Sequence, residues 1–251
     1  MGAVAPLFVR PQLWPWALGA VVANHAVITA AGLWPRSNLL GPNWTRLPKE
    51  CAARGEVALS IDDGPEPAVT PRVLDMLDEH AAKATFFCIG QRVSQHPELA
   101  REIVRRGHAL ENHSHAHPYH FSLLGPRGMA AEVAKAQEVI TDVTGQRPRF
   151  FRAPAGLRNP FLEPVLERLE LRLASWTRRG FDTVNHRPDV VYGKLTRHLG
   201  GGDILLLHDG NAAITEAGSP VIFDVLPRLL ATFKARQLTP VTLPSALNVS
   251  A

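Results

Sequence analysis

The chain has 251 residues, of which 45% are apolar and 20% are charged, and its net charge at pH 7 is +4. These values are typical of a globular protein and argue against intrinsic disorder, and the length suits one large domain or an α/β barrel. The cysteines, Cys51 and Cys88, are too few for a cysteine zinc site or a disulfide scaffold, and the sequence leaves open whether they pair. No basic cluster is interleaved with aromatic residues, so the composition gives no support for nucleic-acid binding.

Residues 1–35 form an apolar N-terminal segment. Between Gln12 and Trp34 no side chain is charged if His25 is neutral, and this length is enough to span a bilayer. Tryptophans near both ends are typical of membrane interfaces. We expect a membrane anchor or an uncleaved signal, with a cleaved signal peptide or a helix packed on the domain as alternatives. The basic residues that follow favour a cytoplasmic domain, but they are too few to decide the side of the membrane.

Residues 36–55 contain several prolines and are predicted to be a linker. From residue 56 to 246, apolar runs typical of buried parallel strands alternate with helical patterns. Strands are predicted at 57–61, 84–89, 109–111, 149–152, 171–176, 204–207 and 240–243, and helices between most of them. This alternation predicts an α/β fold with a parallel sheet, and seven strands suit a barrel better than an open sheet.

Unusual polar residues follow five of the predicted strands. Asp62-Asp63 closes the first strand, His113 to His117 follows the third, Arg152 ends the fourth, Asp182 follows the fifth, and His208 follows the sixth. In parallel βα folds, functional groups gather beyond the carboxyl ends of the strands. The sequence therefore predicts that these groups share one site.

Two of these groups suggest a metal centre. Adjacent carboxylates at Asp62 and Asp63 repel each other, and a cation would hold both ionised, although Asp-Asp-Gly-Pro also suits a solvated turn. His113 and His117 are four residues apart, so one helical turn would place both imidazoles on the same side. With one aspartate they would form a two-histidine, one-carboxylate set for zinc or a similar divalent ion.

Five motifs occur in the order found in a known family. They are S-I-D-D-G-P at 60–65, H-S-H-A-H-P at 113–118, R-A-P-A-G at 152–156, the segment Trp176 to Asp182, and L-L-H at 206–208. In these motifs, residues 56–243 resemble the polysaccharide deacetylases of carbohydrate esterase family four, the NodB-homology domain. The resemblance makes residues 56–246 the catalytic domain. It implies a distorted (β/α) barrel of seven strands, carrying the N-terminal apolar helix.

The resemblance also implies metal-dependent removal of an N-acyl group from an amino sugar. By position in the motifs, Asp63, His113 and His117 would bind the metal, and Asp62 would be the general base. Zinc is the expected ion, with cobalt and manganese as alternatives.

Further roles follow from the same resemblance. Arg152 would orient the base, His208 would be the general acid, and Asp182 would position or tune His208. The backbone N–H of Ala155 would help to hold the oxyanion, and Leu206 would line the pocket for the acyl methyl group. Ala155 departs from the family pattern, because an aromatic residue usually follows the proline of this motif.

The expected function is therefore a metal-dependent hydrolase that removes N-acetyl groups from an amino-sugar polysaccharide or oligosaccharide. One alternative is a deacetylase or deformylase of a lipid-linked amino sugar. Another is a non-catalytic carbohydrate-binding relative, which would be expected to lack the base, a ligand or the acid. The expected partners are an N-acetylated carbohydrate and a membrane, with no protein partner implied.

Overall fold

The computed structural model describes residues 11–247, so residues 1–10 of the predicted N-terminal segment lie outside the described residues. Its strands form one sheet in which every pairing is parallel, in the order β5-β4-β3-β2-β1-β7-β6, with β8 paired to the start of β1. The strands are β1 (Glu56–Asp62), β2 (Thr85–Cys88), β3 (Ala109–Asn112), β4 (Phe150–Phe151), β5 (Arg172–Leu173), β6 (Arg178–Arg179), β7 (Ile204–His208) and β8 (Thr239–Val241). The predicted α/β fold, a distorted barrel of parallel strands, is confirmed as a curled half-barrel, and the short strand β6 is an addition to the predicted set.

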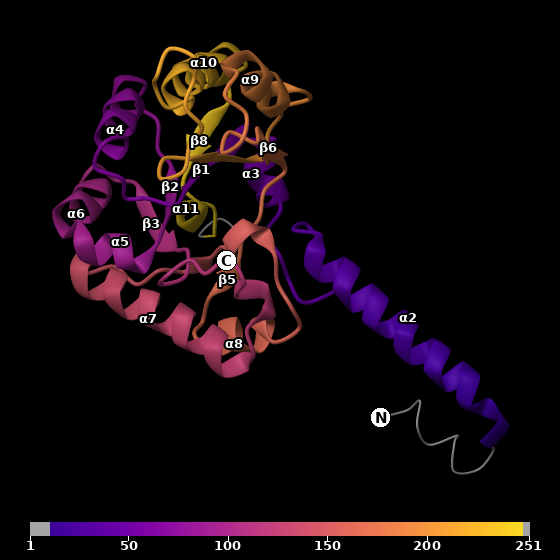
Figure 1. The fold of residues 1–251 in the computed structure, drawn as a ribbon. Coiled ribbons are helices and arrows are strands. Elements are labelled where there is room, and N and C mark those ends of the chain that lie inside the picture. The colour runs from indigo at the N-terminus through magenta and orange to yellow at the C-terminus, as the bar shows by residue number, and fades with distance from the viewer. Residues whose placement is uncertain (1–10, 248–251) are drawn as a thin grey trace.

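Helices lie around the outside of the sheet (Figure 1). They are α4 (Thr70–Glu79), α5 (Gly90–Gln95), α6 (Pro97–Arg105), α7 (Pro126–Thr144), α8 (Leu162–Arg168), α9 (Pro188–Thr196) and α10 (Ile222–Ala235), with α11 (Leu243–Leu247) near the C-terminus. Most follow the predicted apolar periodicity. Helix α7 ends at Gly145, whose φ of 71° gives the left-handed C-cap that glycine adopts without strain.

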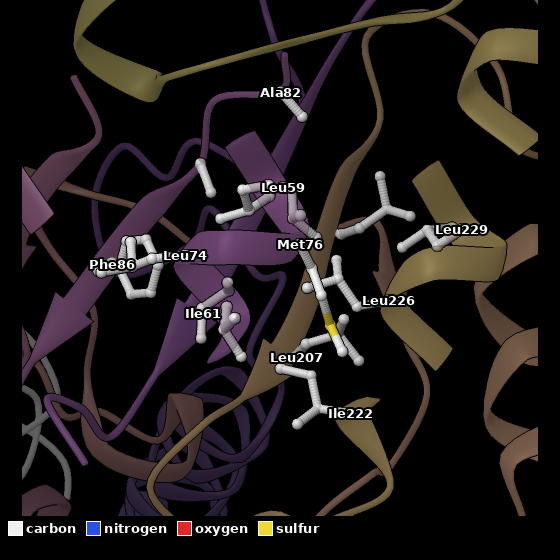
Figure 2. Close-up of a cluster of buried hydrophobic side chains, with 14 of the residues drawn as sticks. Leu59, Ile61, Leu74, Met76, Ala82, Phe86, Leu207, Ile222, Leu226 and Leu229 are labelled. Atoms are coloured by element: carbon white, nitrogen blue, oxygen red, sulfur yellow. The ribbon is translucent and has the colours of Figure 1, made fainter. Parts of the chain in front are cut away.

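The main hydrophobic core lies between the sheet and helices α4 and α10 (Figure 2). Strand β1 contributes Leu59 and Ile61, and the neighbouring β7 contributes Leu207. Leu226 of α10 and Leu74 of α4 pack against them, and all five side chains are fully buried. This packing fixes β1 and β7 side by side, and therefore also fixes the polar residues at their ends.

Helix α2 (Trp14–Leu33) projects away from the rest of the chain (Figure 1). It has 20 residues and a mean hydropathy of 1.5, and only 11% of its apolar window is buried. By length and composition it is able to cross a membrane, although a signal sequence near an N-terminus has the same properties.

The predicted linker is ordered against the sheet rather than free of it. Trp44 forms a parallel bridge to Ala174 beyond β5, and Arg46 forms an antiparallel bridge to Asp203 just before β7. The following helix, α3 (Lys49–Ala53), buries Cys51. Residues 44–53 are thus part of the folded unit. Cys51 and Cys88 are both buried and free.

We expect Leu226→Ala to destabilise the domain. Leu226 is 0% exposed, and truncating a buried leucine costs about 2–5 kcal/mol through lost burial and the cavity left behind. Urea unfolding followed by circular dichroism measures this free energy. Leu123→Ala is the matched control, because Leu123 is 82% exposed and its truncation should change the free energy of unfolding by less than about 0.5 kcal/mol. Equal losses in the two variants would contradict the assigned core.

Candidate active site

The polar residues predicted to share a site are brought together at the carboxyl end of the sheet. Asp62 is the last residue of β1, and in register it lies beside His208, the last residue of β7. Asp63 follows with a φ of 75°, a left-handed conformation that is uncommon outside glycine. This turn is why two consecutive carboxylates both reach one cleft, instead of pointing to opposite faces as they would in a strand.

Asp63, His113 and His117 form a candidate metal centre. The Oδ1 atom of Asp63 lies 3.2 Å from Nε2 of His113 and 3.4 Å from Nε2 of His117. The three ligand atoms lie within 4.8 Å of one another. Asp63 Oδ1 is buried and has no hydrogen-bond partner among the described residues, which is costly unless another group completes the site. Two imidazoles and one carboxylate with an unpaired buried oxygen are a donor set that fits a divalent cation.

The predicted helical turn from His113 to His117 is wrong. This segment is a loop in which Ser114 and His117 have φ values of 61° and 51°. Side chains take the place of helical hydrogen bonds, because Asn112 Oδ1 accepts the Ser114 N–H at 3.0 Å and Ser114 Oγ accepts the His117 N–H at 3.1 Å. The imidazoles still meet, with ring centroids 4.8 Å apart, and His113 Nδ1 bonds the carbonyl oxygen of Arg152 at 2.8 Å.

Arg152 is buried inside the curled sheet and pairs with Asp62. Its Nη1 donates to Asp62 Oδ1 at 2.6 Å and to Ser60 Oγ at 2.8 Å. The other guanidinium nitrogens donate to the carbonyl oxygens of Ala174 and Ser175. Asp62 Oδ2 lies 3.8 Å from His113 Nε2, beside the candidate metal centre. One oxygen of Asp62 is therefore held by arginine, while the other faces the candidate ligands.

His208 pairs with Asp182 in the loop after β6. The Asp182 Oδ2 atom accepts the backbone N–H of His208 at 2.7 Å, and Oδ1 lies 2.9 Å from the ring atom Nδ1. Burial alone would lower the pKa of His208, but the Asp182 charge and hydrogen bond outweigh it and raise this pKa to about 9. Because Nδ1 is engaged, Nε2 is the ring nitrogen left for the cleft that His208 lines.

The charge on Asp63 is set by its histidine neighbours. Burial would raise the pKa of Asp63, but the adjacent imidazole of His113 and the nearby histidine charges hold this pKa well below its ordinary range. Asp63 is thus a carboxylate at neutral pH. This is the form that binds a cation.

The site opens into a cleft of about 480 Å³. Ala155 and Leu206, predicted to contact the acyl group, both line it, as does Trp176. Ala155 has a φ of 54° within the turn that follows Arg152, so its backbone conformation is as unusual as that of Asp63. The cleft therefore contains Asp62, Asp63, His113, His117 and His208, the residues that the motifs place in one site.

Two polar residues of the site were not predicted to belong to it. Asn211 lines the cleft, and its Nδ2 donates to Asp63 Oδ2 at 2.8 Å, so this amide holds the oxygen that the histidines do not approach. Ser60 accepts from Arg152 and donates to the carbonyl oxygen of Leu205 at 2.7 Å. Asn211 lies three residues after the end of β7, and this closeness to a strand end could have indicated that it belongs to the site. Ser60 is a strand interior residue, and nothing in the sequence distinguishes its role.

A model of the polysaccharide deacetylase family matches residues 49–174, about half of the chain. The chain belongs to this family. Among its relatives, a peptidoglycan-N-acetylglucosamine deacetylase of Bacillus cereus is 29% identical over 207 residues, covering 78% of this chain and 70% of the relative. A chitooligosaccharide deacetylase of Azorhizobium caulinodans is 33% identical over 158 residues, covering 62% of this chain and 75% of the relative.

Solved structures share the fold. A family 4 carbohydrate esterase from Streptomyces lividans, solved with acetate, has a TM-score of 0.67 and 32% identity, covering 74% of this chain and 91% of its own. A pseudoenzyme of the family from Bacillus anthracis has a TM-score of 0.72 and 23% identity, covering 82% and 69%. Because the fold is found in both kinds of protein, activity has to be argued from the residues. Asp182 and His208 lie beyond the part matched by the family model.

We expect Asp182→Asn to lower the pKa of His208 from about 9 by roughly 1–3 units, because the charge that opposes desolvation is lost. NMR titration of the metal-free protein measures this pKa. A histidine pKa raised by folding stabilises the native state fully below the unfolded pKa of about 6.5. That contribution is lost as the pH rises through about 9. Asp182→Asn should therefore lower the free energy of unfolding most below about pH 6.5, and its difference from the wild type should disappear above about pH 9.

Asp189→Asn is the control for this titration, because Asp189 is an exposed aspartate that pairs with Arg228 instead. It should leave the His208 titration unchanged. A His208 pKa that is the same in Asp182→Asn and in the wild type would show that Asp182 does not tune this ring.

Proposed function

We propose that the protein is a metal-dependent hydrolase that removes N-acetyl groups from an amino-sugar polysaccharide or oligosaccharide. The observation that carries this proposal is the different pairing of two adjacent carboxylates in one cleft. Asp62 is held by Arg152, while Asp63 lies between His113 and His117. Amide hydrolysis needs an activated water, a polarised carbonyl and a proton for the leaving amine, and each task has a separate candidate group.

Asp63, His113 and His117 would hold the metal. Imidazole nitrogens with one carboxylate suit zinc, and cobalt or manganese are alternatives for the same donors. When bound, such an ion supplies Lewis acidity toward the carbonyl and lowers the pKa of water to about 7. Asn211 supports this set, because its amide fixes the second oxygen of Asp63 and so orients the first toward the histidines.

Asp62 would be the general base. The Arg152 guanidinium donates to Oδ1, so Oδ2 is left to accept a proton from the attacking water. The pair is buried, since the side chains of Arg152 and Asp62 are 1% and 4% exposed. Arg152 is itself fixed by backbone carbonyls, and the orientation of Asp62 is therefore set before any substrate arrives.

His208 would be the general acid. A pKa of about 9 keeps its ring protonated at neutral pH, so a proton is available for the departing amine nitrogen. Asp182 holds Nδ1, which leaves the proton on Nε2 as the one to be donated. The raised pKa, the hydrogen bond and the position of His208 in the cleft agree with this role.

Ala155 and Leu206 would bind the acyl end of the substrate. The backbone N–H of Ala155 would donate to the developing oxyanion, a role that the side chain does not affect. Leu206 is 1% exposed and lines the cleft on β7, two residues before His208, so it would bound the space for the acyl methyl group.

The named relatives support a glycan substrate, because two of them are deacetylases of peptidoglycan and of chitooligosaccharides. A deacetylase or deformylase of a lipid-linked amino sugar is the second candidate, and helix α2 favours it as a membrane anchor. A non-catalytic relative is disfavoured because the base, the ligands and the acid are all present in one cleft.

We expect purified protein incubated with zinc to retain about one equivalent, and His113→Ala/His117→Ala to lose it, because two of three protein ligands are removed. Metal analysis after gel filtration measures the content. His186→Ala/His198→Ala is the matched control, since both histidines are exposed. Full metal content in the His113/His117 variant would place the metal elsewhere.

We expect Asp62→Asn to lower acetate release by at least about 10²-fold while metal content stays unchanged, because the amide cannot accept the proton of the water. Release is measured on chitin oligomers, peptidoglycan and lipid-linked amino sugars. Asp224→Asn, at an exposed position of α10, should retain full activity. Unchanged turnover in Asp62→Asn would exclude Asp62 as the base, whereas no release from any substrate by the wild-type protein would favour the non-catalytic alternative.

A further inference from the structure

The large apolar side chains exposed in residues 40–247 share one position in the fold. All of them lie in segments between the carboxyl end of a strand and the α-helix that follows it: Tyr119, Leu123, Phe161, Phe181, Val184 and Ile214. Their exposures range from 45% for Phe181 to 101% for Tyr119. Single exposed apolar residues are common on soluble proteins, but they are normally scattered over the surface. We call this set the apolar rim, because Tyr119 and Val184 also line the candidate active-site cleft.

The end of helix α2 is attached to the same side of the molecule. Gly32 accepts the Arg158 N–H at 3.2 Å, and the Arg158 guanidinium donates to the carbonyl oxygen of Ser37. Ser175 Oγ donates to the carbonyl oxygen of Pro35 at 2.7 Å. Pro35 packs so closely on Gly156, a residue of the cleft wall, that a Cβ on Gly156 would lie 2.8 Å from Pro35 Cβ. The end of α2 therefore has a fixed position beside the cleft.

Asn159 connects this attachment to the apolar rim. Its Nδ2 donates to the carbonyl oxygens on either side of Leu123, those of Ser122 and Leu124, at 2.9 Å each. Its Oδ1 accepts the N–H of Phe161 at 2.9 Å. Because Asn159 directly follows Arg158, Leu123 and Phe161 are the rim residues held next to the end of α2.

The residues next to the end of α2 suit an anionic surface. From residue 34 to 45 the only charged side chain is that of Arg36, which is exposed. Basic residues next to a membrane helix attract anionic headgroups. Trp34, 59% exposed at the end of α2, is a residue type that prefers the membrane interface.

We propose that the part of the apolar rim next to α2, Leu123 and Phe161, rests on the surface of the bilayer that α2 spans. The cleft would then take N-acyl amino sugars held at that surface. This inference rests on the proposed deacetylase function and its membrane anchor. A lipid surface is favoured over a protein or a second copy of the chain because Leu123 and Phe161 are linked to the end of α2 through Asn159 and Arg158. That helix has a mean hydropathy of 1.5 and is almost entirely exposed.

The position of the rim is tested with the full chain in vesicles of phosphatidylcholine and phosphatidylglycerol. Leu123→Cys and Glu79→Cys each carry an environment-sensitive fluorophore, and Cys51 and Cys88 are buried and free. Glu79, at the end of α4 near the start of β8, is the control at the opposite end of the strands. We expect lipid-attached quenchers to quench the probe at residue 123 and not the probe at residue 79. Equal quenching at the two positions, or none at 123, would overturn the proposal.

Flotation of the same vesicles separates this inference from the anchor. A full chain that fails to float with the vesicles would overturn both the anchor and the rim contact. A chain that floats while residue 123 stays unquenched would overturn the rim contact alone.

Activity provides a second test, with Leu123→Ser/Phe161→Ser. Neither residue lines the cleft, so acetate release from a soluble chitin oligomer should equal that of the wild type. On vesicles that display an N-acetylglucosaminyl lipid, we expect a loss of roughly tenfold or more, since two interfacial apolar side chains are removed. Equal rates on the vesicles would overturn the inference, and so would equal losses on both substrates. No release from either substrate by the wild-type protein would instead count against the deacetylase function, and the quenching would still decide the rim.

Discussion

The candidate site depends on one buried ion pair, Arg152 with Asp62. A guanidinium inside a sheet is costly unless its donors are satisfied, and this one bonds Asp62, Ser60 and two backbone carbonyl oxygens and lies 4.1 Å from the ring centroid of Phe87. These contacts join β1 to the segments that follow β4 and β5. Removing one partner would leave the other charge buried and unpaired, a loss of about 3–5 kcal/mol. The pair therefore determines both the shape of the strand ends and the direction of the proposed base.

The same constraint separates the roles of two neighbouring carboxylates. Asp62 stays in the strand and faces the arginine, while the left-handed backbone of Asp63 turns its carboxylate toward the histidines. Ser114, His117 and Ala155 also have positive φ values, so strained backbone gathers around the cleft. Such conformations cost about 1–3 kcal/mol each and persist where the surrounding contacts enforce them. The site is thus positioned by loops whose conformations are fixed by hydrogen bonds from side chains.

This explains what the sequence predicted and what it did not. Apolar periodicity located the helices and the longer strands, because burial repeats with the period of each element. Strand-end chemistry then grouped Asp62, Asp63, His208 and the histidine loop, because a parallel sheet brings its carboxyl ends together. The left-handed turn at Ser114 depends on side-chain contacts that spacing does not reveal, so the helical interpretation failed there. The bridge from Trp44 to Ala174 and the bond from Asn211 to Asp63 join distant parts of the chain, and no local pattern reports them.

The side chain of Ala155 departs from the family motif on the wall of the cleft that would contact the sugar of the proposed substrate. Ala155 keeps a backbone donor but removes an aromatic wall from the cleft. In the segment from Trp176 to Asp182, Arg178 pairs with Asp203. It also donates to the backbone carbonyl oxygens of Arg197 and His198, so its role is structural. Arg179 lines the cleft beside Trp176, with the guanidinium 5.3 Å from that ring and 5.0 Å from the ring of Phe181. The hydrolytic groups are thus arranged independently of the walls that would contact the rest of the substrate. Under the proposed function, a change of these walls would alter which amino sugar fits without altering how its amide is attacked.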